Sequence, residues 1–331
     1  MSPHAAGLIR LRPHAYRLAA MIALPLALTA CDAEQSLAPD AQESAPPGVA
    51  ADVTPGFATT PQRFVYAIYR NGGYDISRMD ATTGQNVVSL TNTQVSESEP
   101  AWSFDNKRVA FTSYRTVAGQ TRRDIYITNA DGTNGHWARS QACSCDLGHP
   151  SWSPDGSRMV VAMSLNGVDY IAYLILGTGQ LGAFSTGYGG LPGTQPSYTK
   201  SGQIVYVGPT HKTVFRMSGT ATNIKALYTA VTPLAQPALS PDGSKLAFVQ
   251  AVNEFGNTDI FLRNLTTGTT TKIAGSPTSD AFPTWSPDGS RIAFSSARSG
   301  VSQIYTMTPT GGSVTKISKS GKPEGYPAWS H

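Results

Sequence analysis

The stretch Pro283-Thr284-Trp285-Ser286-Pro287-Asp288-Gly289-Ser290-Arg291-Ile292-Ala293-Phe294 decides the fold of this chain. Its central Pro-Asp-Gly is a tight-turn signal, because proline presets φ and glycine accepts a positive φ. The residues after the turn are apolar and β-prone, which is typical of a strand. The stretch therefore predicts two strands joined by a tight turn.

The Pro-x-Trp-Ser word at the start of this stretch recurs along the chain. Clear copies begin at Pro100, Pro150, Pro283 and Pro327, and weaker copies begin at Pro196 and Pro237. Successive prolines are 50, 46, 41, 46 and 44 residues apart. Complete units continue with an apolar second strand, a third strand and, after a polar glycine turn, a fourth. Four short antiparallel strands in a unit of about 45 residues are typical of a propeller blade.

The two ends of this repeat complement each other. Phe64 to Leu90 supplies a second, third and fourth strand with no Pro-x-Trp-Ser before it, whereas Pro327 to Ser330 supplies a first strand with no further strand after it. Pairing them completes a sixth blade and closes the ring, so that no sheet edge stays open. We predict an all-β, six-bladed β-propeller over residues 61–331, with four antiparallel strands per blade and the C-terminal strand paired with the N-terminal blade.

The repeated word Pro-x-Trp-Ser-Pro-Asp-Gly-Ser-Arg-Ile-Ala-Phe resembles the PD40, or WD40-like, repeat of TolB-family proteins. The resemblance covers residues 61–331 in six copies and implies a TolB-like propeller. It does not extend to the N-terminal α/β domain that joins TolB to the rest of its machinery. We expect a lipid tether in the place of that domain.

The first 30 residues read as an export signal. They contain three arginines and no acid, followed by an apolar run from Leu18 to Ala30 that is too short to span a bilayer as a helix. The run ends in Leu28-Thr29-Ala30-Cys31, which resembles the lipobox of bacterial lipoproteins. The resemblance implies that residues 1–30 are cleaved off and that Cys31 becomes the lipidated N-terminus. We therefore expect the protein in the bacterial cell envelope, lipid-anchored and either periplasmic or on the cell surface.

Composition and charge indicate a tether after the leader and exclude several classes of protein and partner. Residues 32–60 contain five acids, no basic residue and no apolar period, so residues 31–60 are predicted to be the lipidated cysteine and a disordered tether. The whole chain is 40% hydrophobic and 14% charged, with three cysteines, which excludes a disulfide scaffold and a polytopic membrane protein. Without the three leader arginines the formal charge falls from +4 to +1. Nucleic acid is therefore not an expected partner.

The residues directly before the six prolines are candidate ligand contacts, because the first strands line a propeller's channel and the preceding loops surround one mouth. They are Glu99, His149, Gln195, Gln236, Phe282 and Tyr326, and three acids stand two positions earlier, at Glu97, Asp280 and Glu324. An acidic arc suits a cation or a basic peptide segment, and Phe282 and Tyr326 suit apolar anchoring. The alternative is that these are ordinary solvated loop residues.

Cys143-Ser144-Cys145-Asp146 with His149 and His136 is the cluster in the sequence that most resembles a metal site. Two cysteines and two histidines suit zinc, but the Cys-x-Cys gap is shorter than usual for that metal. In an exported protein the pattern favours a local disulfide between Cys143 and Cys145. A metal at this position stays an open alternative.

The sequence contains no Gly-x-Ser-x-Gly, no His-Glu-x-x-His and no phosphate loop. The repeated Trp, Pro and Asp-Gly positions are predicted to be structural. We therefore predict a non-enzymatic, lipid-anchored module that binds a protein or peptide, needs no cofactor and meets the membrane through its anchor. The alternative is a carbohydrate-active enzyme or glycan-binding propeller with a divalent cation at the channel mouth. It rests on the oligogalacturonate lyases, which are similar PD40 propellers that hold a metal with several histidines.

Overall fold

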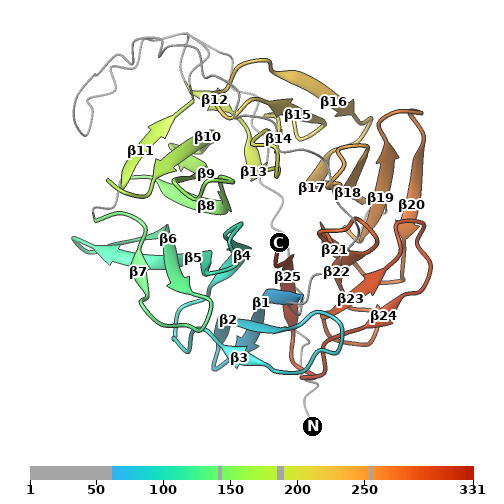
Figure 1. Cartoon of the computed structure of the whole chain (residues 1–331), viewed down its shortest axis with the longest axis horizontal. Helices are drawn as coiled ribbons and strands as arrows, with labels where there is room; N and C mark the ends of the chain where they lie inside the picture. Colours follow the sequence, from blue (N-terminus) through green and yellow to red (C-terminus); the bar gives the residue numbers. More distant parts are fainter. Residues whose placement is uncertain (1–61, 141–143, 185–189, 253–255) are drawn as a thin grey trace, which may run out of the picture. The chain divides into compact units, whose positions relative to one another are not determined.

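The computed structural model describes residues 62–140, 144–184, 190–252 and 256–331. Every regular element in these residues is a β-strand, and the strands form six antiparallel sheets around a central axis (Figure 1). The predicted all-β, six-bladed propeller is confirmed. The predicted leader, the lipidation site Cys31 and the tether lie outside the described residues.

The strands of each blade follow one another from the hub outward. The blade that closes the ring contains β25 (Glu324–Trp329), β1 (Arg63–Arg70), β2 (Gly73–Asp80) and β3 (Val88–Ser89). The second contains β4 (Ser98–Trp102), β5 (Arg108–Val117), β6 (Gln120–Asn129) and β7 (His136–Trp137), and the third β8 (Asp146–Trp152), β9 (Arg158–Leu165), β10 (Val168–Ile175) and β11 (Gln180–Ala183) with β12 (Leu191–Pro192). The fourth contains β13 (Thr194–Tyr198), β14 (Ile204–Val207), β15 (Thr213–Met217) and β16 (Lys225–Thr229). The fifth contains β17 (Leu234–Leu239), β18 (Lys245–Ala251), β19 (Thr258–Asn264) and β20 (Thr270–Ala274), and the sixth β21 (Asp280–Trp285), β22 (Ile292–Ser296), β23 (Gln303–Met307) and β24 (Thr315–Lys316).

The third blade differs from the predicted four strands. Its outer position is divided between β11, which pairs with Ala172 to Ile175 of β10, and β12, which pairs with Tyr170 and Ile171 of the same strand. The two short strands together cover the outer edge of β10.

The ring is closed by strand exchange, as the sequence predicts. β25 pairs antiparallel with β1, with Phe64 opposite Trp329 and Val65 opposite Ala328. The rings of Phe64 and Trp329 lie 4.4 Å apart between centroids. Past the end of β25, the Ser330 N–H donates to the Arg63 carbonyl at 2.8 Å. The innermost strand of this blade therefore comes from the far end of the chain.

The repeated tryptophans pack between neighbouring blades. Trp152 is fully buried against Ala110 and Ile125 of the preceding blade and Met159 of its own. Its indole Nε1 also donates to the Ala101 carbonyl of the preceding blade at 3.2 Å. Burial of so large an aromatic surface joins adjacent sheets, which is the structural role the repeat predicts.

The repeated Asp-Gly acids hold the turns between first and second strands. Asp155 Oδ1 accepts hydrogen bonds from the Ser153 hydroxyl at 2.5 Å and the Ser157 N–H at 3.0 Å. Asp242 does the same with Ser240 and Ser244, and these hydrogen bonds lower the pKa of Asp242 to about 2. These acids therefore have a local structural role.

Candidate functional site in the central cavity

The six residues before the repeated prolines form a ring at the hub. All six have a left-handed backbone, with φ between 51° and 56°, and each lies at an irregularity of its first strand. In the second blade, for example, Glu99 and Pro100 together face the single residue Phe111. Such β-bulges re-aim side chains, and here they turn the six residues toward the channel. We call Glu99, His149, Gln195, Gln236, Phe282 and Tyr326 the bulge ring.

Side chains of the bulge ring fix the backbone of the next blade. Glu99 Oε2 accepts the His149 N–H at 2.7 Å, and Gln195 Oε1 accepts the Gln236 N–H at 2.6 Å. Gln236 Oε1 in turn accepts the Phe282 N–H at 2.6 Å. Left-handed backbone costs free energy in residues other than glycine, so these bonds stabilise an otherwise unfavourable conformation.

Glu99 carries a charge that its neighbours balance. His149 Nε2 lies 3.3 Å from Glu99 Oε1, and the Thr112 hydroxyl donates to Oε2 at 2.8 Å. Burial opposes ionisation of Glu99, but the charges of His149 and Arg123 and these hydrogen bonds outweigh it, so the pKa of Glu99 lies below its usual value. Glu99 therefore presents to the channel a carboxylate whose oxygens are already in contact with His149 and Thr112.

The other side of the ring offers amide donors and an aromatic surface. The carbonyl oxygens of Gln195 and Gln236 are occupied by the bonds above, whereas their Nε2 groups make no hydrogen bond with the described residues. Beside them, the rings of Phe282 and Tyr326 lie 3.9 Å apart between centroids. Burial raises the pKa of Tyr326, so its phenol stays protonated at physiological pH.

A cavity of about 660 Å³ extends from the bulge ring along the first strands. Its other end is lined by the residues four positions after each repeated proline, which we call the turn ring. These are Phe104, Pro154, Lys200, Pro241, Pro287 and His331. The strand residues on the N-terminal side of the bulge ring do not line it. Its volume is within the usual range for ligand pockets.

Sequence reasoning missed the turn ring. Three of its members stand where a copy departs from Ser-Pro-Asp-Gly: Phe104, Lys200 and His331. His331 stacks on Phe104 with ring centroids 4.0 Å apart and an interplanar angle of 12°, and its N–H donates to Asn106 Oδ1 at 2.7 Å. The turn ring could have been found from the positions that deviate from the repeat. At these positions the aromatic pair Phe104–His331 and the cation Lys200 replace the usual proline.

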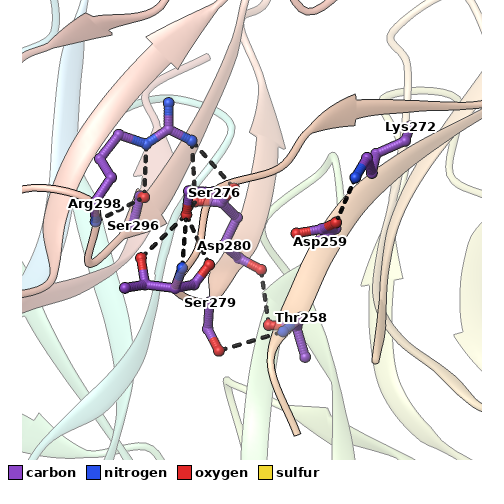
Figure 2. Close-up of polar contacts among 9 residues, drawn as sticks. Thr258, Asp259, Lys272, Ser276, Ser279, Asp280, Ser296 and Arg298 are labelled. Carbon is purple, nitrogen blue, oxygen red and sulfur yellow. Dashed lines mark hydrogen bonds and ion pairs between the residues drawn. The ribbon is translucent and has the colours of Figure 1, made fainter. Parts of the chain in front are cut away.

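The three acids predicted beside the mouth do not line this cavity, which corrects the expected acidic arc. Glu97, Asp280 and Glu324 are at most 3% exposed and each binds its own blade-to-blade loop. Asp280 pairs with Arg298 at 3.1 Å, as Figure 2 shows, beside the Asp259–Lys272 pair. The physical reason is the bulge. Residues two apart share a face only in regular strands, and the left-handed residue breaks that alternation.

The buried acids are also held near neutrality or paired. Burial raises the pKa of Glu97 to about 7 against the hydrogen bonds from Thr91 and Thr93, with a further rise from the charge of Asp75. Burial likewise raises the pKa of Glu324, although hydrogen bonds from Ser318 and Ser320 oppose it. Among the described residues that line the cavity, Glu99 is the one carboxylate side chain. The cavity is therefore not acidic.

The cysteine and histidine cluster is divided between strands. Cys145 is buried and disulfide-bonded, and Cys143 lies outside the described residues. His136 is exposed on the outer strand β7, whereas His149 is at the hub beside Glu99. Over the described ranges, no group of three His, Cys, Asp or Glu residues is arranged to hold a metal ion.

Comparison with known proteins agrees with this architecture. The PD40 family model, described as the TolB beta propeller domain, matches residues 220–331. The chain carries a TolB-like β-propeller. TolB from Acinetobacter baumannii superposes with a TM-score of 0.67 at 20% identity, over 81% of this chain and 66% of that one, so the chain spans just under two thirds of that protein. The putative TolB from Agrobacterium tumefaciens superposes with a TM-score of 0.60 at 18% identity, over 78% of this chain and 89% of that one.

Solved structures other than TolB proteins share the propeller fold. An oligogalacturonate lyase in complex with manganese gives a TM-score of 0.52 at 14% identity, over 78% of this chain and 74% of that one. The sequence matches no curated protein. In the described part of the chain, no helix has the length and apolar character needed to cross a membrane.

Proposed function

We propose that the protein is a non-enzymatic binding module that holds a peptide segment of a partner protein in its central cavity. In this proposal Cys31 anchors it in the bacterial cell envelope, with the propeller in the periplasm or at the cell surface. The cavity between the bulge ring and the turn ring is the observation that carries the proposal. The TolB-like architecture supports an envelope role.

The chemistry of the cavity suits a neutral or acidic peptide. The free Nε2 groups of Gln195 and Gln236 are donors for backbone carbonyls, and the Phe282–Tyr326 surface accepts an apolar side chain. Lys200 is exposed at the turn ring and makes no ion pair with a described residue. Glu97, Asp280 and Glu324 are buried outside the cavity, so the cavity does not have the acidic lining that would favour a basic peptide or a cation.

A variant that fills the cavity tests this function. Ser197 lines the cavity, is exposed and makes no side-chain hydrogen bond with a described residue, so Ser197→Trp should block it without unfolding the propeller. We expect crosslinking in intact envelopes to capture a specific partner with the wild type and at least about tenfold less with Ser197→Trp. Thr271→Trp, at an exposed position of the outer strand β20, is the matched control and should capture as the wild type does. Equal capture by all three would reject the cavity as the binding site.

The glycan alternative is supported by the structural similarity to a manganese-bound oligogalacturonate lyase. It predicts binding or turnover of acidic polysaccharides that a chelator abolishes. Purified wild-type protein incubated with such polysaccharides, with and without chelator, separates the two functions. Chelator-sensitive turnover would replace the peptide-binding proposal by an enzymatic one.

The anchor is tested separately. Cys31→Ser removes the thiol that the lipobox resemblance assigns to acylation. We expect incorporation of a labelled fatty acid into the wild type and none into Cys31→Ser, because one thiol carries the diacyl group. Unchanged labelling of the variant would refute the anchor while leaving the cavity proposal intact.

A further inference from the structure

The loop from the closing blade to the second blade is held by two buried acids. It comprises residues 91–96, which we call the connecting loop, and Glu97 follows it directly. Asp75, near the start of β2, accepts the Thr93 N–H on Oδ1 at 2.8 Å. Glu97 is 3% exposed and Asp75 is 1% exposed, whereas five of the six loop residues are exposed. The side chains of the loop bury little surface, so polar contacts hold it in place.

Two threonines of the connecting loop place a hydroxyl at each oxygen of Glu97. Thr91 Oγ1 accepts the Ile76 N–H at 2.8 Å and donates to Glu97 Oε2. Thr93 Oγ1 lies 3.2 Å from Glu97 Oε1 and also 3.2 Å from the Val95 carbonyl oxygen. Both carboxyl oxygens of Glu97 therefore take part in the hydrogen bonds that hold the loop.

The Thr93 hydroxyl has one hydrogen for these two acceptors. When Glu97 is ionised, the hydroxyl donates either to Oε1 or to the Val95 carbonyl, and the other acceptor is left out. When Glu97 carries a proton on Oε1, it donates that proton to Thr93 Oγ1, and Thr93 donates to the Val95 carbonyl. The protonated acid therefore makes one more hydrogen bond within the loop than the carboxylate does.

The charges at this site also favour the protonated form. Among residues 62–140, 144–184, 190–252 and 256–331, no Lys, Arg or His forms an ion pair with Asp75 or Glu97. Asp75 Oδ2 is buried and has no hydrogen-bond partner in those ranges. Burial raises the pKa of Glu97 to about 7 with a further rise from the charge of Asp75, against the hydrogen bonds from Thr91 and Thr93. Two buried carboxylates without a counter-ion repel each other, so ionisation of Glu97 weakens the closed loop.

We infer that Glu97 is a proton-operated latch that holds the connecting loop closed over β2 when it is protonated and lets the loop open when it ionises. In the closed form the Val95 carbonyl lies against the first residue of β2, since a Cβ added to Gly73 would be 3.3 Å from its oxygen. Opening hydrates the carboxylate of Glu97 and separates the loop from Asp75. The loop therefore opens one residue before β4, the innermost strand of the second blade.

The direction of the pH dependence follows from the two forms of the loop. In an open loop Glu97 is hydrated and has a pKa near its ordinary value of 4.5, whereas in the closed loop its pKa is about 7. The closed loop therefore binds the proton more tightly than the open loop does. Opening becomes more favourable as the pH rises from about 4.5 to about 7 and stays constant above that range.

Other titratable groups on the elements packed against β4 do not explain this dependence. Those engaged by another group are Arg70 (by Ser89), Arg115 (by Asp124), Asp146 (by the Arg123 N–H), His149 (by Glu99) and Glu324 (by Ser318 and Ser320). Those toward the other end of their strands are Arg63, Arg78, Asp80 and Arg108. The tyrosines are Tyr66, Tyr74 and Tyr326, whose pKa values are raised by burial, and the exposed Tyr69 and Tyr114. Asp75 is the charged neighbour that acts on Glu97.

Hydrogen exchange of the full chain tests the latch without any ligand. Exchange of the amides in residues 91–97 is measured by mass spectrometry between pH 5 and pH 8 and corrected for the intrinsic pH dependence of amide exchange. We expect their protection to fall at least about tenfold over this range, because the pKa difference between open and closed loops exceeds one unit. Residues 276–280 are the internal control, since Asp280 is paired with Arg298, and their protection should not change.

Three variants assign the effect to Glu97. Glu97→Gln imitates the protonated acid, because its amide nitrogen can donate to Thr93, so the protection should stay high at every pH. Asp75→Asn keeps the acceptor for the Thr93 N–H but removes the neighbouring charge, so the fall should occur at lower pH. Glu324→Gln is the matched control, since burial raises the pKa of this acid too, and residues 91–97 should respond as in the wild type.

Each other outcome contradicts the latch. Constant protection of residues 91–97 in the wild type would show that the loop does not respond to pH. A fall that persists in Glu97→Gln, or that disappears in Glu324→Gln, would assign the response to another group and overturn the inference. Should Glu97→Gln fail to fold, Asp75→Asn decides, because an unchanged midpoint would show that the two acids do not interact.

Discussion

Removal of residues 324–331 is expected to abolish the cooperative unfolding of the propeller. These residues contain β25, the innermost strand of the closing blade, and their loss leaves β1 with an unpaired edge at the hub. Phe64 and Tyr66, both at most 1% exposed, would then lose the cover that Trp329 provides in their shared cluster. An open ring also loses the contacts of β25 with β4 and β21 on either side. Urea unfolding followed by intrinsic fluorescence measures the result.

Single substitutions in the C-terminal segment should lower the stability by smaller amounts than its removal. Trp329→Ala keeps the strand but empties a buried indole site, which should lower the free energy of unfolding by about 3–5 kcal/mol. His331→Ala removes the stack on Phe104 and leaves β25 intact, so a loss of about 1 kcal/mol is expected. A synthetic peptide of residues 322–331 added to the truncated chain should restore part of the transition. A truncated chain with the wild-type midpoint would show that the ring does not need its closing strand.

The sequence predicted those parts of the fold that depend on short local patterns, namely the turns, the blade number and the ring closure. Each Pro-Asp-Gly reports its own turn, and the strand after Pro327 has no partner except the incomplete unit at Phe64. Blade number and closure follow from those two facts, because three strands at one end of the chain and one strand at the other can complete a single blade and leave no edge unpaired. The buried tryptophans were predictable for a similar reason, since a repeated large aromatic must pack in every repeat.

The orientation of the site residues was not predictable in this way. Proline disfavours the helical region for the residue before it and biases that residue toward extended backbone, so no local signal announced the left-handed φ of Glu99 or Gln236. Side chains of the neighbouring blade accept the backbone N–H of His149, Gln236 and Phe282 and so help to hold their left-handed conformation. Tertiary contacts of this kind are invisible in one sequence. The error about Glu97, Asp280 and Glu324 follows directly, since their direction depends on the bulge.

Asp280→Ala should destabilise the propeller by about 3 kcal/mol without any ligand present. Asp280 is 0% exposed, both of its oxygens lie 3.1 Å from Arg298 Nη2, and the Ser276 hydroxyl also contacts it (Figure 2). Truncation leaves the Arg298 guanidinium, which also lies over the rings of Phe294 and Tyr305, without its counter-ion. Breaking a buried pair typically costs 3–5 kcal/mol, and the 23% exposure of Arg298 places the expected loss at the lower end.

A thermodynamic cycle then separates the ion pair from packing. Thermal and urea unfolding of Asp280→Ala, Arg298→Ala and the double variant should give a coupling of about 1–3 kcal/mol, because both single variants remove the same contact. Asp169→Ala changes an exposed acid of β10 that makes no ion pair with a described residue and should stay within about 0.5 kcal/mol of the wild type. If Asp280→Ala unfolds like Asp169→Ala, the acid does not stabilise its loop, and a role in ligand binding becomes the better explanation of its position. The expected large loss instead means that alanine at Asp280 cannot be used to probe the cavity, so ligand tests belong at Ser197 and Lys200, whose side chains hold no part of the fold.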